Sequence, residues 1–487
     1  MSHRALLRAT IGTAVVILAL AAASQREVKA VGPTLVDRNL ILRKMAVGFD
    51  QPASFEFLAP NDVLVLERAT GKVIRVFGNS HATVLDLPVN NASERGLLGI
   101  ALHPDFATTR EVFLYWTESL TGSDTSVLNA TPILGNRIDR FVWDGANLTM
   151  AANVIRLRAI QQDPGQSERG SNNGGALRIG PDDKLYVFVG DLGRRGQLQN
   201  LRCGPINRDD CPPLSPMPDD PFGGPAPDDE HLSGVVLRLN LDGTAPSDNP
   251  FFAAGAAIGG EVGANIQKIY SFGHRSSSGM AFDPRGGALW LQENGDDSFS
   301  ELNRVTAGMN GGWVQLAGPR SRITQFKSIE TTFGGVNLQQ LRWPTANIAD
   351  STSEALSRLF SLPGSHYEDP EFSWKWEVAP AGIGFIDSRD LGSPYEGDLI
   401  VGAGTSLLEG GYLFRFQLTS NRRRVEVTDA RLNDRVADNL EKNEITESES
   451  LLFGRDFGVV TDVGTGPNGN LFVLSLSNGA LYEIGRR

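Results

Sequence analysis

Carboxylate side chains gather in the stretch 293–301, which reads Glu-Asn-Gly-Asp-Asp-Ser-Phe-Ser-Glu. Calcium ions prefer carboxylate and backbone carbonyl oxygens, and acidic residues around a glycine turn offer both. We therefore predict a Ca²⁺ site formed by Gly295, Asp296 and Glu301. The alternative is an acidic surface turn that holds no ion.

Two other charged residues, Asp191 and Arg275, lie close to glycines at predicted strand ends. An aspartate in this position can act on a ligand, or it can close an Asx turn with its own backbone. Arg275 follows the turn at Gly273. It can bind an anionic or carbonyl group in a pocket, or it can pair with a carboxylate such as Asp191 to hold two loops together.

The loop after Asp191 carries two arginines and leads to the two cysteines of the chain. Arg194 and Arg195 can supply positive charge to an acidic ligand, or they can be solvated loop residues. Cys203 and Cys211 lie in a stretch rich in Pro and Asp. In an oxidising compartment they predict a local disulfide, whereas free thiols or part of a metal site are the alternatives.

The elements that position these residues repeat along the chain. A turn of the Pro-Asp/Asn-Gly kind precedes a short apolar run in five segments, and a weaker sixth copy is present. The turn reverses the chain and the apolar run then forms a buried strand. The six turns and runs lie at 59–66, 103–116, 180–191, 283–290, 394–401 and 466–474.

A supersecondary unit that recurs buries its apolar face against its neighbours. Radially arranged copies of a four-stranded antiparallel unit form a β-propeller, so we predict an all-β fold with six blades. The first and last strands are expected to share a blade and thereby close the ring. The functional residues of such a fold are expected in loops that converge on the central channel.

The N-terminal segment has the features of an export signal. Arg4 and Arg8 precede an apolar run at 11–23, and small residues at 22–24 suit cleavage. The run is short for a spanning helix, which needs about 20 apolar residues, so no stable membrane span is expected. We predict a signal peptide at 1–24 and a secreted or periplasmic protein.

The predicted organisation continues with a leader at 25–45 and a propeller at 46–487. Loop insertions are expected near 194–232, 242–266 and 320–371, because these stretches are rich in Pro, Asp, Gly or Ala or contain helix-like pieces. The net charge is −12 at pH 7. Nucleic acid is excluded as a partner on this ground, because phosphate binding needs a basic field.

Several loop motifs resemble the glucose/sorbosone dehydrogenase family, which includes soluble quinoprotein sugar dehydrogenases that use pyrroloquinoline quinone (PQQ) and calcium. The motifs occur in the family's order, and the segment 466–484 resembles its closing blade. The stretches that carry the resemblance are 94–106, 173–193, 236–243, 273–284 and 301–313.

The resemblance implies a six-bladed propeller that oxidises a sugar or polyol hydroxyl and passes a hydride to PQQ, with an external electron acceptor. The family's general base is a histidine, and Asn172 occupies that position here. The supporting acid is retained as Asp191 and the active-site arginine as Arg275. Glu94 and Asn294 are expected to face the substrate or cofactor.

The sequence also departs from the family. An amide is not a base near neutral pH, so Asp191 or Glu94 would have to replace the histidine. The lysine and two arginines that hold the carboxylates of PQQ have no counterparts in the stretches 382–386 and 457–462. Two other functions therefore stay open: a non-enzymatic propeller that binds carbohydrate or protein, and a calcium-dependent hydrolase of the lactonase kind.

Overall fold

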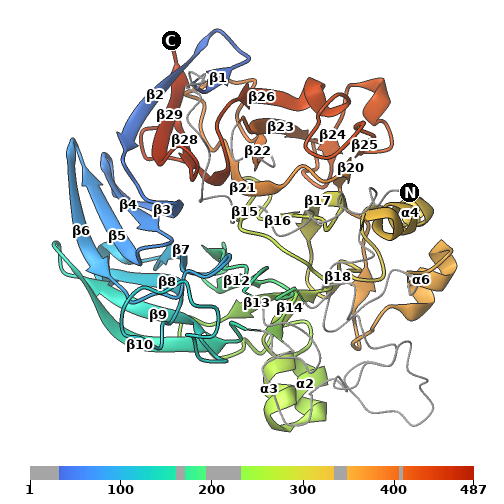
Figure 1. The fold of residues 1–487 in the computed structure, drawn as a ribbon, viewed down its shortest axis with the longest axis horizontal. Helices are drawn as coiled ribbons and strands as arrows, with labels where there is room; N and C mark the ends of the chain where they lie inside the picture. The colour runs from blue at the N-terminus through green and yellow to red at the C-terminus, as the bar shows by residue number, and fades with distance from the viewer. Residues whose placement is uncertain (1–31, 161–169, 194–231, 334–347, 405–409) are drawn as a thin grey trace, which may run out of the picture.

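The computed structural model describes residues 32–160, 170–193, 232–333, 348–404 and 410–487. Within these residues the strands form six β-sheets that are arranged radially (Figure 1). The prediction of an all-β propeller is thereby confirmed.

In chain order, the first two sheets are four-stranded antiparallel meanders. The third sheet is a meander extended by two short strands. The first sheet comprises β3 (Pro52–Ala59), β4 (Asp62–Glu67), β5 (Lys72–Phe77) and β6 (Ser80–Asp86). The second comprises β7 (Leu97–Leu102), β8 (Glu111–Thr117), β9 (Asn136–Trp143) and β10 (Leu148–Leu157), with α1 (Phe106–Thr109) between its first two strands. The third comprises β11 (Leu177–Ile179), β12 (Leu185–Val189), β13 (Val235–Leu239), β14 (Ile269–Phe272), β18 (Met309–Asn310) and β19 (His366–Tyr367).

The remaining sheets take strands from distant parts of the chain. The fourth comprises β15 (Met280–Phe282), β16 (Leu289–Glu293), β17 (Ser298–Val305), β20 (Phe372–Trp376) and β25 (Val436–Ala437). The fifth comprises β21 (Pro380–Phe385), β22 (Leu399–Ala403), β23 (Tyr412–Leu418), β24 (Val425–Glu426), β26 (Leu452–Arg455) and β1 (Thr34–Leu35). The sixth comprises β27 (Val460–Thr465), β28 (Leu471–Ser475), β29 (Ala480–Arg486) and β2 (Leu40–Val47).

The six repeated segments of the sequence form the second strands of six different sheets, which are β4, β8, β12, β16, β22 and β28. Every residue of these strands except Glu111, at the start of β8, is buried. A second strand is hydrogen-bonded on both edges and packed on both faces. This explains why its sequence is a nearly continuous apolar run and not an alternating one.

The first strand of each sheet contacts the first strand of the next sheet, and the contact between β27 and β3 completes the circle. The sheets are antiparallel meanders at this inner side, so the loop before a first strand and the loop after a second strand lie on one face of the ring. The turns between first and second strands lie on the opposite face. This topology gathers residues that are far apart in sequence.

The propeller begins earlier than the predicted boundary at residue 46. β1 pairs with β26, and β2 pairs with β29, so part of the predicted leader at 25–45 belongs to two sheets. Among the described residues β2 pairs along one edge only, with β29, and Arg43 and Lys44 interrupt its apolar residues. The pairing of β2 with β29 confirms that the first and last strands of the ring share a sheet.

Two of the predicted insertions contain helices. Between β13 and β14 the chain forms α2 (Phe252–Ile258) and α3 (Gly260–Ile266), at the bottom of Figure 1. Between β18 and β20 it forms η3 (Arg320–Arg322), α4 (Ile323–Phe333) and α6 (Thr352–Arg358). The insertion predicted at 194–232 falls outside the described residues except for its last residue. Two short 3₁₀ helices, η5 (Ala430–Leu432) and η6 (Ser448–Leu451), flank β25.

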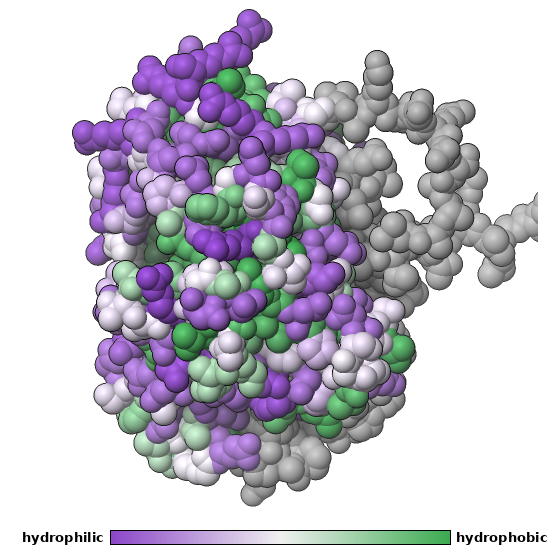
Figure 2. Space-filling view, turned by 90° about the vertical axis from the view of Figure 1, so that its left-hand side faces the viewer, coloured by the Kyte–Doolittle hydropathy of each residue, from purple (hydrophilic) through white to green (hydrophobic). Residues whose placement is uncertain are grey.

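Figure 2 shows the side of the ring formed by the outer strands near β2 and β6. Hydrophilic side chains lie between the hydrophobic ones on this side, as expected for strands with one solvated face. In the described part of the chain, no helix has both the length and the apolar character needed to cross a membrane. The predicted signal peptide at 1–24 lies outside the described residues.

Candidate functional site

Three loops on one face of the ring bring Asn172, Asp191 and Arg275 together. Asn172 precedes β11, Asp191 follows β12, and Arg275 precedes β15. The backbone N–H of Asp191 donates to the carbonyl of Arg275 at 2.9 Å. A Cβ atom on Gly190 would lie 2.1 Å from the carbonyl oxygen of Asn172, so only glycine permits this close approach of the loops.

Asp191 is the centre of this arrangement and is fully buried. Its Oδ1 accepts hydrogen bonds from Asn172 Nδ2 at 2.7 Å and from the backbone N–H of Gly193 at 2.8 Å. Its Oδ2 accepts from Trp313 Nε1 at 2.8 Å. The bond to Gly193 is the Asx turn considered from the sequence, and the other two tie three loops together.

Arg275 holds the acidic loop in place. Its guanidinium donates at 2.8 Å to the carbonyls of Asn294 and Gly295, and it pairs with Asp296 at 2.9 Å. The indole of Trp313 lies beneath it, with the guanidinium carbon 5.6 Å from the ring centroid. The arginine therefore pairs with Asp296, and its positive charge is held beside the acidic loop.

Glu94 is placed next to Asn172 by the turn before β7. Its Oε2 accepts the backbone N–H of Asn172 at 2.6 Å. Glu94 is partly exposed, in contrast to Asp191. Burial raises the pKa of the Glu94 carboxyl above its ordinary value, while the hydrogen bond from Asn172 opposes this rise.

The other two residues of the predicted metal site, Gly295 and Glu301, have different hydrogen-bond partners. Glu301 is on β17, where Oε1 accepts from the backbone N–H of Gly318 at 2.6 Å and Oε2 accepts from Asn303 Nδ2 at 2.9 Å. Burial and the nearby Glu293 raise the pKa of Glu301 to about 8. The carbonyl of Gly295 faces Arg275 instead.

Asp296 belongs to a different acidic cluster, which it forms with Asp297 and Glu330. One carboxylate oxygen from each residue lies within 4.8 Å of the others, and all three residues are buried. Glu330 comes from α4 of the insertion and accepts from the backbone N–H of Asp297 at 3.2 Å. Asp297 Oδ2 is buried and has no hydrogen-bond partner within the described residues. The oxygen donors suit a hard cation such as Ca²⁺.

Two further charges border this cluster. The ammonium group of Lys442 pairs with Asp297 Oδ1 and lies 3.9 Å from Glu377 Oε2. Burial raises the pKa of the Glu377 carboxyl to about 7, although Lys442 opposes this rise. Burial, together with the neighbouring Asp296, also raises the pKa of Asp297. Lys442 and Arg275 thus already supply positive charge to the three carboxylates.

Asn294 lies in the acidic loop between β16 and β17. Its backbone N–H donates to the carbonyl of Ser276 at 2.8 Å. Its side-chain Oδ1 is a buried acceptor that lacks a hydrogen-bond partner in the described part of the chain. The predicted residues Arg194, Arg195, Cys203 and Cys211 all fall outside the described residues.

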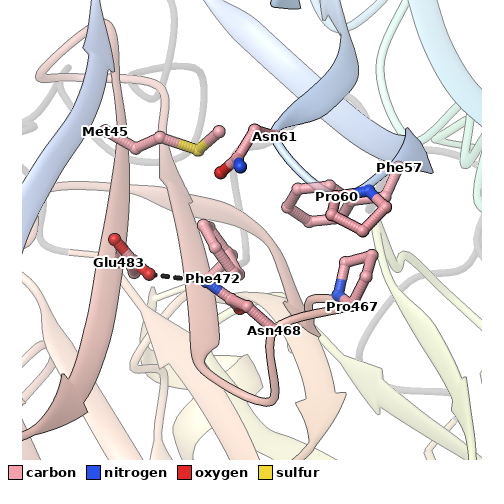
Figure 3. Close-up of a pocket in the computed structure, with 8 residues that line it drawn as sticks. All are labelled: Met45, Phe57, Pro60, Asn61, Pro467, Asn468, Phe472 and Glu483. Atoms are coloured by element: carbon pink, nitrogen blue, oxygen red, sulfur yellow. Dashed lines mark hydrogen bonds between the residues drawn. The ribbon is translucent and has the colours of Figure 1, made fainter. Parts of the chain in front are cut away.

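A small cavity on the opposite face is not part of this site (Figure 3). It lies between the turns that join β3 to β4 and β27 to β28, and its volume is about 30 Å³. Such a space has room for little more than a water molecule. Its lining residues are Met45, Phe57, Pro60, Asn61, Pro467, Asn468, Phe472 and Glu483.

Sequence reasoning missed several residues of the site. Glu293 accepts from the backbone N–H of Arg275 at 2.8 Å and contacts His274 Nδ1 at 2.6 Å, so it fixes the turn that presents Arg275. Glu330 and Lys442 come from an insertion and from a loop after β25, where no local pattern marks them. Trp313 lies in the stretch 301–313, one of the motifs that resemble the family. This motif could have pointed to Trp313 as a site residue.

Comparisons with known proteins show the family to which the chain is similar. The family model described as Glucose / Sorbosone dehydrogenase matches residues 49–352. Quinoprotein glucose dehydrogenase B of Acinetobacter calcoaceticus is 33% identical over 288 residues, which are 58% of this chain and 53% of that protein. The match thus spans about half the length of this relative.

Two other similar proteins are matched over longer stretches. Aldose sugar dehydrogenase YliI of Escherichia coli is 25% identical over 393 residues, which are 80% of this chain and 77% of that protein. The solved structure of the PQQ-bound form of aldose sugar dehydrogenase from Streptomyces coelicolor has a TM-score of 0.55 and 22% identity. The superposition covers 92% of this chain and 98% of the Streptomyces coelicolor chain.

Proposed function

Because this chain belongs to the glucose/sorbosone dehydrogenase family, we propose that it oxidises a hydroxyl group of a sugar or other polyol. The substrate would lose a proton from oxygen and a hydride from carbon, and a quinone-type acceptor would take up the hydride. An external electron acceptor would then reoxidise the quinone. The relatives named as glucose and aldose sugar dehydrogenases support the substrate class.

The observation that carries this proposal is the joining of Asn172, Asp191 and Arg275 by hydrogen-bonded loops on one face of the ring. The unpartnered Oδ1 of Asn294 adds a buried acceptor, and buried polar atoms are stabilised when a ligand hydroxyl satisfies them. The charge of Arg275, fixed by two carbonyls and Asp296, would stabilise negative charge that develops in the pocket.

The described residues do not fit PQQ in the pose that the resemblance implies. Val459 and Thr461 stand where arginines would hold its carboxylates, and Thr461 Oγ1 donates to the carbonyl of Pro52 at 3.0 Å. Burying a tri-acid without cationic partners would cost several kcal/mol. The acceptor is therefore proposed by its chemical class, and a PQQ-bound neighbour supports that class for the family.

A calcium ion is proposed at Asp296, Asp297 and Glu330. The three carboxylates and the unpartnered Oδ2 of Asp297 support this choice over the predicted set with Glu301. Bound there, Ca²⁺ would add positive charge next to Arg275 and draw an anionic ligand to this face. The same cluster is the observation that favours a second candidate, a calcium-dependent hydrolase of the lactonase kind.

One experiment separates these functions. The purified protein is mixed with PQQ and Ca²⁺, and dye reduction is followed with a panel of aldoses and polyols, while hydrolysis of sugar lactones is followed in parallel without dye. Sugar-dependent dye reduction supports the dehydrogenase. Lactone hydrolysis that EDTA abolishes supports the hydrolase, and sugar binding by calorimetry without either reaction supports a binding propeller.

Two further features of the molecule are proposed on the same basis. We infer that each of the six sheets is one blade, since six repeated segments form six second strands and the first strands contact one another in a circle. A crystal structure in which two sheets merge into one blade would contradict this. Export to the periplasm or the medium is proposed from the segment 1–24, and N-terminal sequencing of the native protein tests cleavage near residue 24.

A further inference from the structure

The amide at position 172 leaves the site without the family's proton acceptor, and Asp191 does not replace it. Asp191 is fully buried, and both of its oxygens accept hydrogen bonds, from Asn172 Nδ2, Gly193 N–H and Trp313 Nε1. Both oxygens of Asp191 are therefore engaged in joining the loops that carry Asn172, Gly193 and Trp313. Its contacts give it a positioning role.

Glu94 stands beside the vacated position and has the properties that Asp191 lacks. Its Oε2 accepts the backbone N–H of Asn172 at 2.6 Å, which fixes the carboxylate next to that residue. Within the described residues no hydrogen bond to Oε1 is found, and the side chain is partly exposed. One oxygen thus anchors the group while the other stays available to a ligand.

The charges around Glu94 come from three other loops. Arg68 follows β4, Arg275 precedes β15, and Asp191 follows β12. Burial raises the pKa of the Glu94 carboxyl, Asp191 adds to this rise, and the two arginines oppose it. A general base works best when its pKa approaches the working pH, so the raised value suits the task.

We propose that Glu94 is the general base of this site and takes the proton of the substrate hydroxyl on Oε1. This inference rests on the proposed function. The proton of the substrate O–H bond would go to Oε1 of Glu94. The hydride of the hydroxyl carbon would go to a separate oxidant of the quinone class, and a carbonyl or lactone would form. In this arrangement the proton acceptor has moved from position 172 to position 94, and Asn172 keeps the hydrogen bond to Asp191.

The first test compares Glu94→Gln with Glu56→Gln in the dye-reduction assay. Glutamine can still accept the N–H of Asn172, so folding is expected to be preserved. We expect kcat to fall by about 10²–10⁴-fold with little change in KM, since base catalysis typically contributes this factor. Glu56 on β3 also has a raised pKa but lies outside the three loops, so its variant is expected to keep the wild-type kcat.

The pH profile distinguishes a base from a structural residue. The carboxylate must be ionised, so wild-type activity is expected to rise with pH through the raised pKa of Glu94. Glu94→Gln is expected to lose this limb, whereas Glu56→Gln keeps it. A Glu94→Gln variant with more than a tenth of the wild-type kcat, or with the acidic limb retained, would overturn the inference.

A binding measurement does not depend on turnover. The probe is a polyhydroxylated amine such as 1-deoxynojirimycin, whose ammonium group can pair with an ionised carboxylate in the pocket. At a pH at which the ammonium group of the probe is protonated, we expect Glu94→Gln to bind at least tenfold more weakly than the wild type in calorimetry. Equal binding by both proteins, or no binding by the wild type, would contradict the role of Glu94 as the general base. Absent dye reduction with intact amine binding would instead overturn the proposed oxidation.

Discussion

At the scale of single residues, the exchange of an imidazole for an amide at position 172 separates two tasks. Asn172 Nδ2 keeps the hydrogen bond to Asp191 at 2.7 Å, so the loops stay joined. Acceptance of a proton is lost, because an amide has no basic nitrogen at neutral pH. Asn172 also adopts φ 51°, a left-handed conformation that asparagine tolerates better than most residues.

We expect Asp191→Asn to destabilise the fold. All three of the hydrogen bonds to Asp191 come from N–H donors, and an amide NH₂ at one oxygen position would face a donor in a buried place. The free energy of unfolding should fall by about 1–3 kcal/mol. Urea denaturation measures this loss.

The control is Asp183→Asn, because Asp183 is an exposed aspartate in the turn between β11 and β12. Its unfolding free energy should stay within about 0.5 kcal/mol of the wild-type value. Equal stability of the Asp191 and Asp183 variants would contradict the role assigned to Asp191.

The sequence was sufficient to predict Asp191, Arg275 and Asn172, because each lies in a loop motif of recognisable spacing. It was not sufficient for Lys442, which reaches Asp297 across 145 positions. The metal site predicted from Gly295, Asp296 and Glu301 stays a prediction. Short sequence spacing does not fix side-chain direction on a strand, and the carboxylate of Glu301 is used by Gly318 and Asn303.

At the scale of elements, the repeated turns predicted six second strands because those strands are buried on both faces. Most of the strand β2, by contrast, lies in the predicted leader at 25–45. It pairs on one edge only within the described part of the chain, and it carries no turn signature of the repeat. The helix α4 shows a different limit, since the sequence indicates helical pieces but not that α4 brings Glu330 to the loop before β17.

We expect Lys442→Met to strengthen Ca²⁺ binding to the Asp296, Asp297 and Glu330 cluster. The ammonium group occupies Asp297 Oδ1, so a cation at this cluster must displace it or share the oxygen. Removal of this competing charge should raise Ca²⁺ affinity about tenfold, which is ~1.4 kcal/mol. Calorimetry and thermal melting with Ca²⁺ and with EDTA measure the change.

Lys327→Met is the control for this variant. Lys327 lies on α4 and pairs with Asp350, whose side chain is 81% exposed. Its loss should leave Ca²⁺ affinity unchanged. If neither the wild type nor Lys442→Met binds Ca²⁺, the proposed ion site is wrong.

At the scale of the whole molecule, an ion pair between a half-buried arginine and a buried aspartate joins two sheets across the ring. Arg178 on β11 pairs with Asp462 on β27 at 2.7 Å, and these strands belong to the third and sixth sheets. Asp462 also accepts from Ser54 Oγ at 2.5 Å and from the backbone N–H of Phe55 at 3.2 Å. Glu56 lies nearby on β3, and burial raises its pKa to about 7.

This cluster predicts a pH dependence of stability. A glutamate with a raised pKa binds its proton more tightly in the folded protein than in the unfolded chain. Its stabilising contribution is complete below the ordinary pKa of 4.5 and is lost as pH rises through about 7. The free energy of unfolding should therefore decrease between pH 5 and pH 8. Glu377, whose pKa is also raised to about 7, adds to this decrease.

Urea denaturation across this pH range tests the effect. Glu56→Gln removes one titrating group, so the decrease with pH should become smaller in this variant. Arg178 lowers the pKa of Glu56 and Asp462 raises it. Both residues are kept in the experiment, because changing either would also shift the pKa of Glu56. A variant with the same pH slope as the wild type would show that Glu56 is not the group that titrates.

The pairing of β2 with β29 has a consequence for how the protein is made. Every other strand of the sixth sheet comes from the end of the chain, and β2 comes from near its beginning. A ribosome produces β2 early, and this strand must then wait for β29 while nearly the whole polypeptide is added. Contacts between such distant segments form late, because closing a long loop costs entropy. Until β29 has been made, β2 lacks its partner in the sixth sheet, and the ring cannot close.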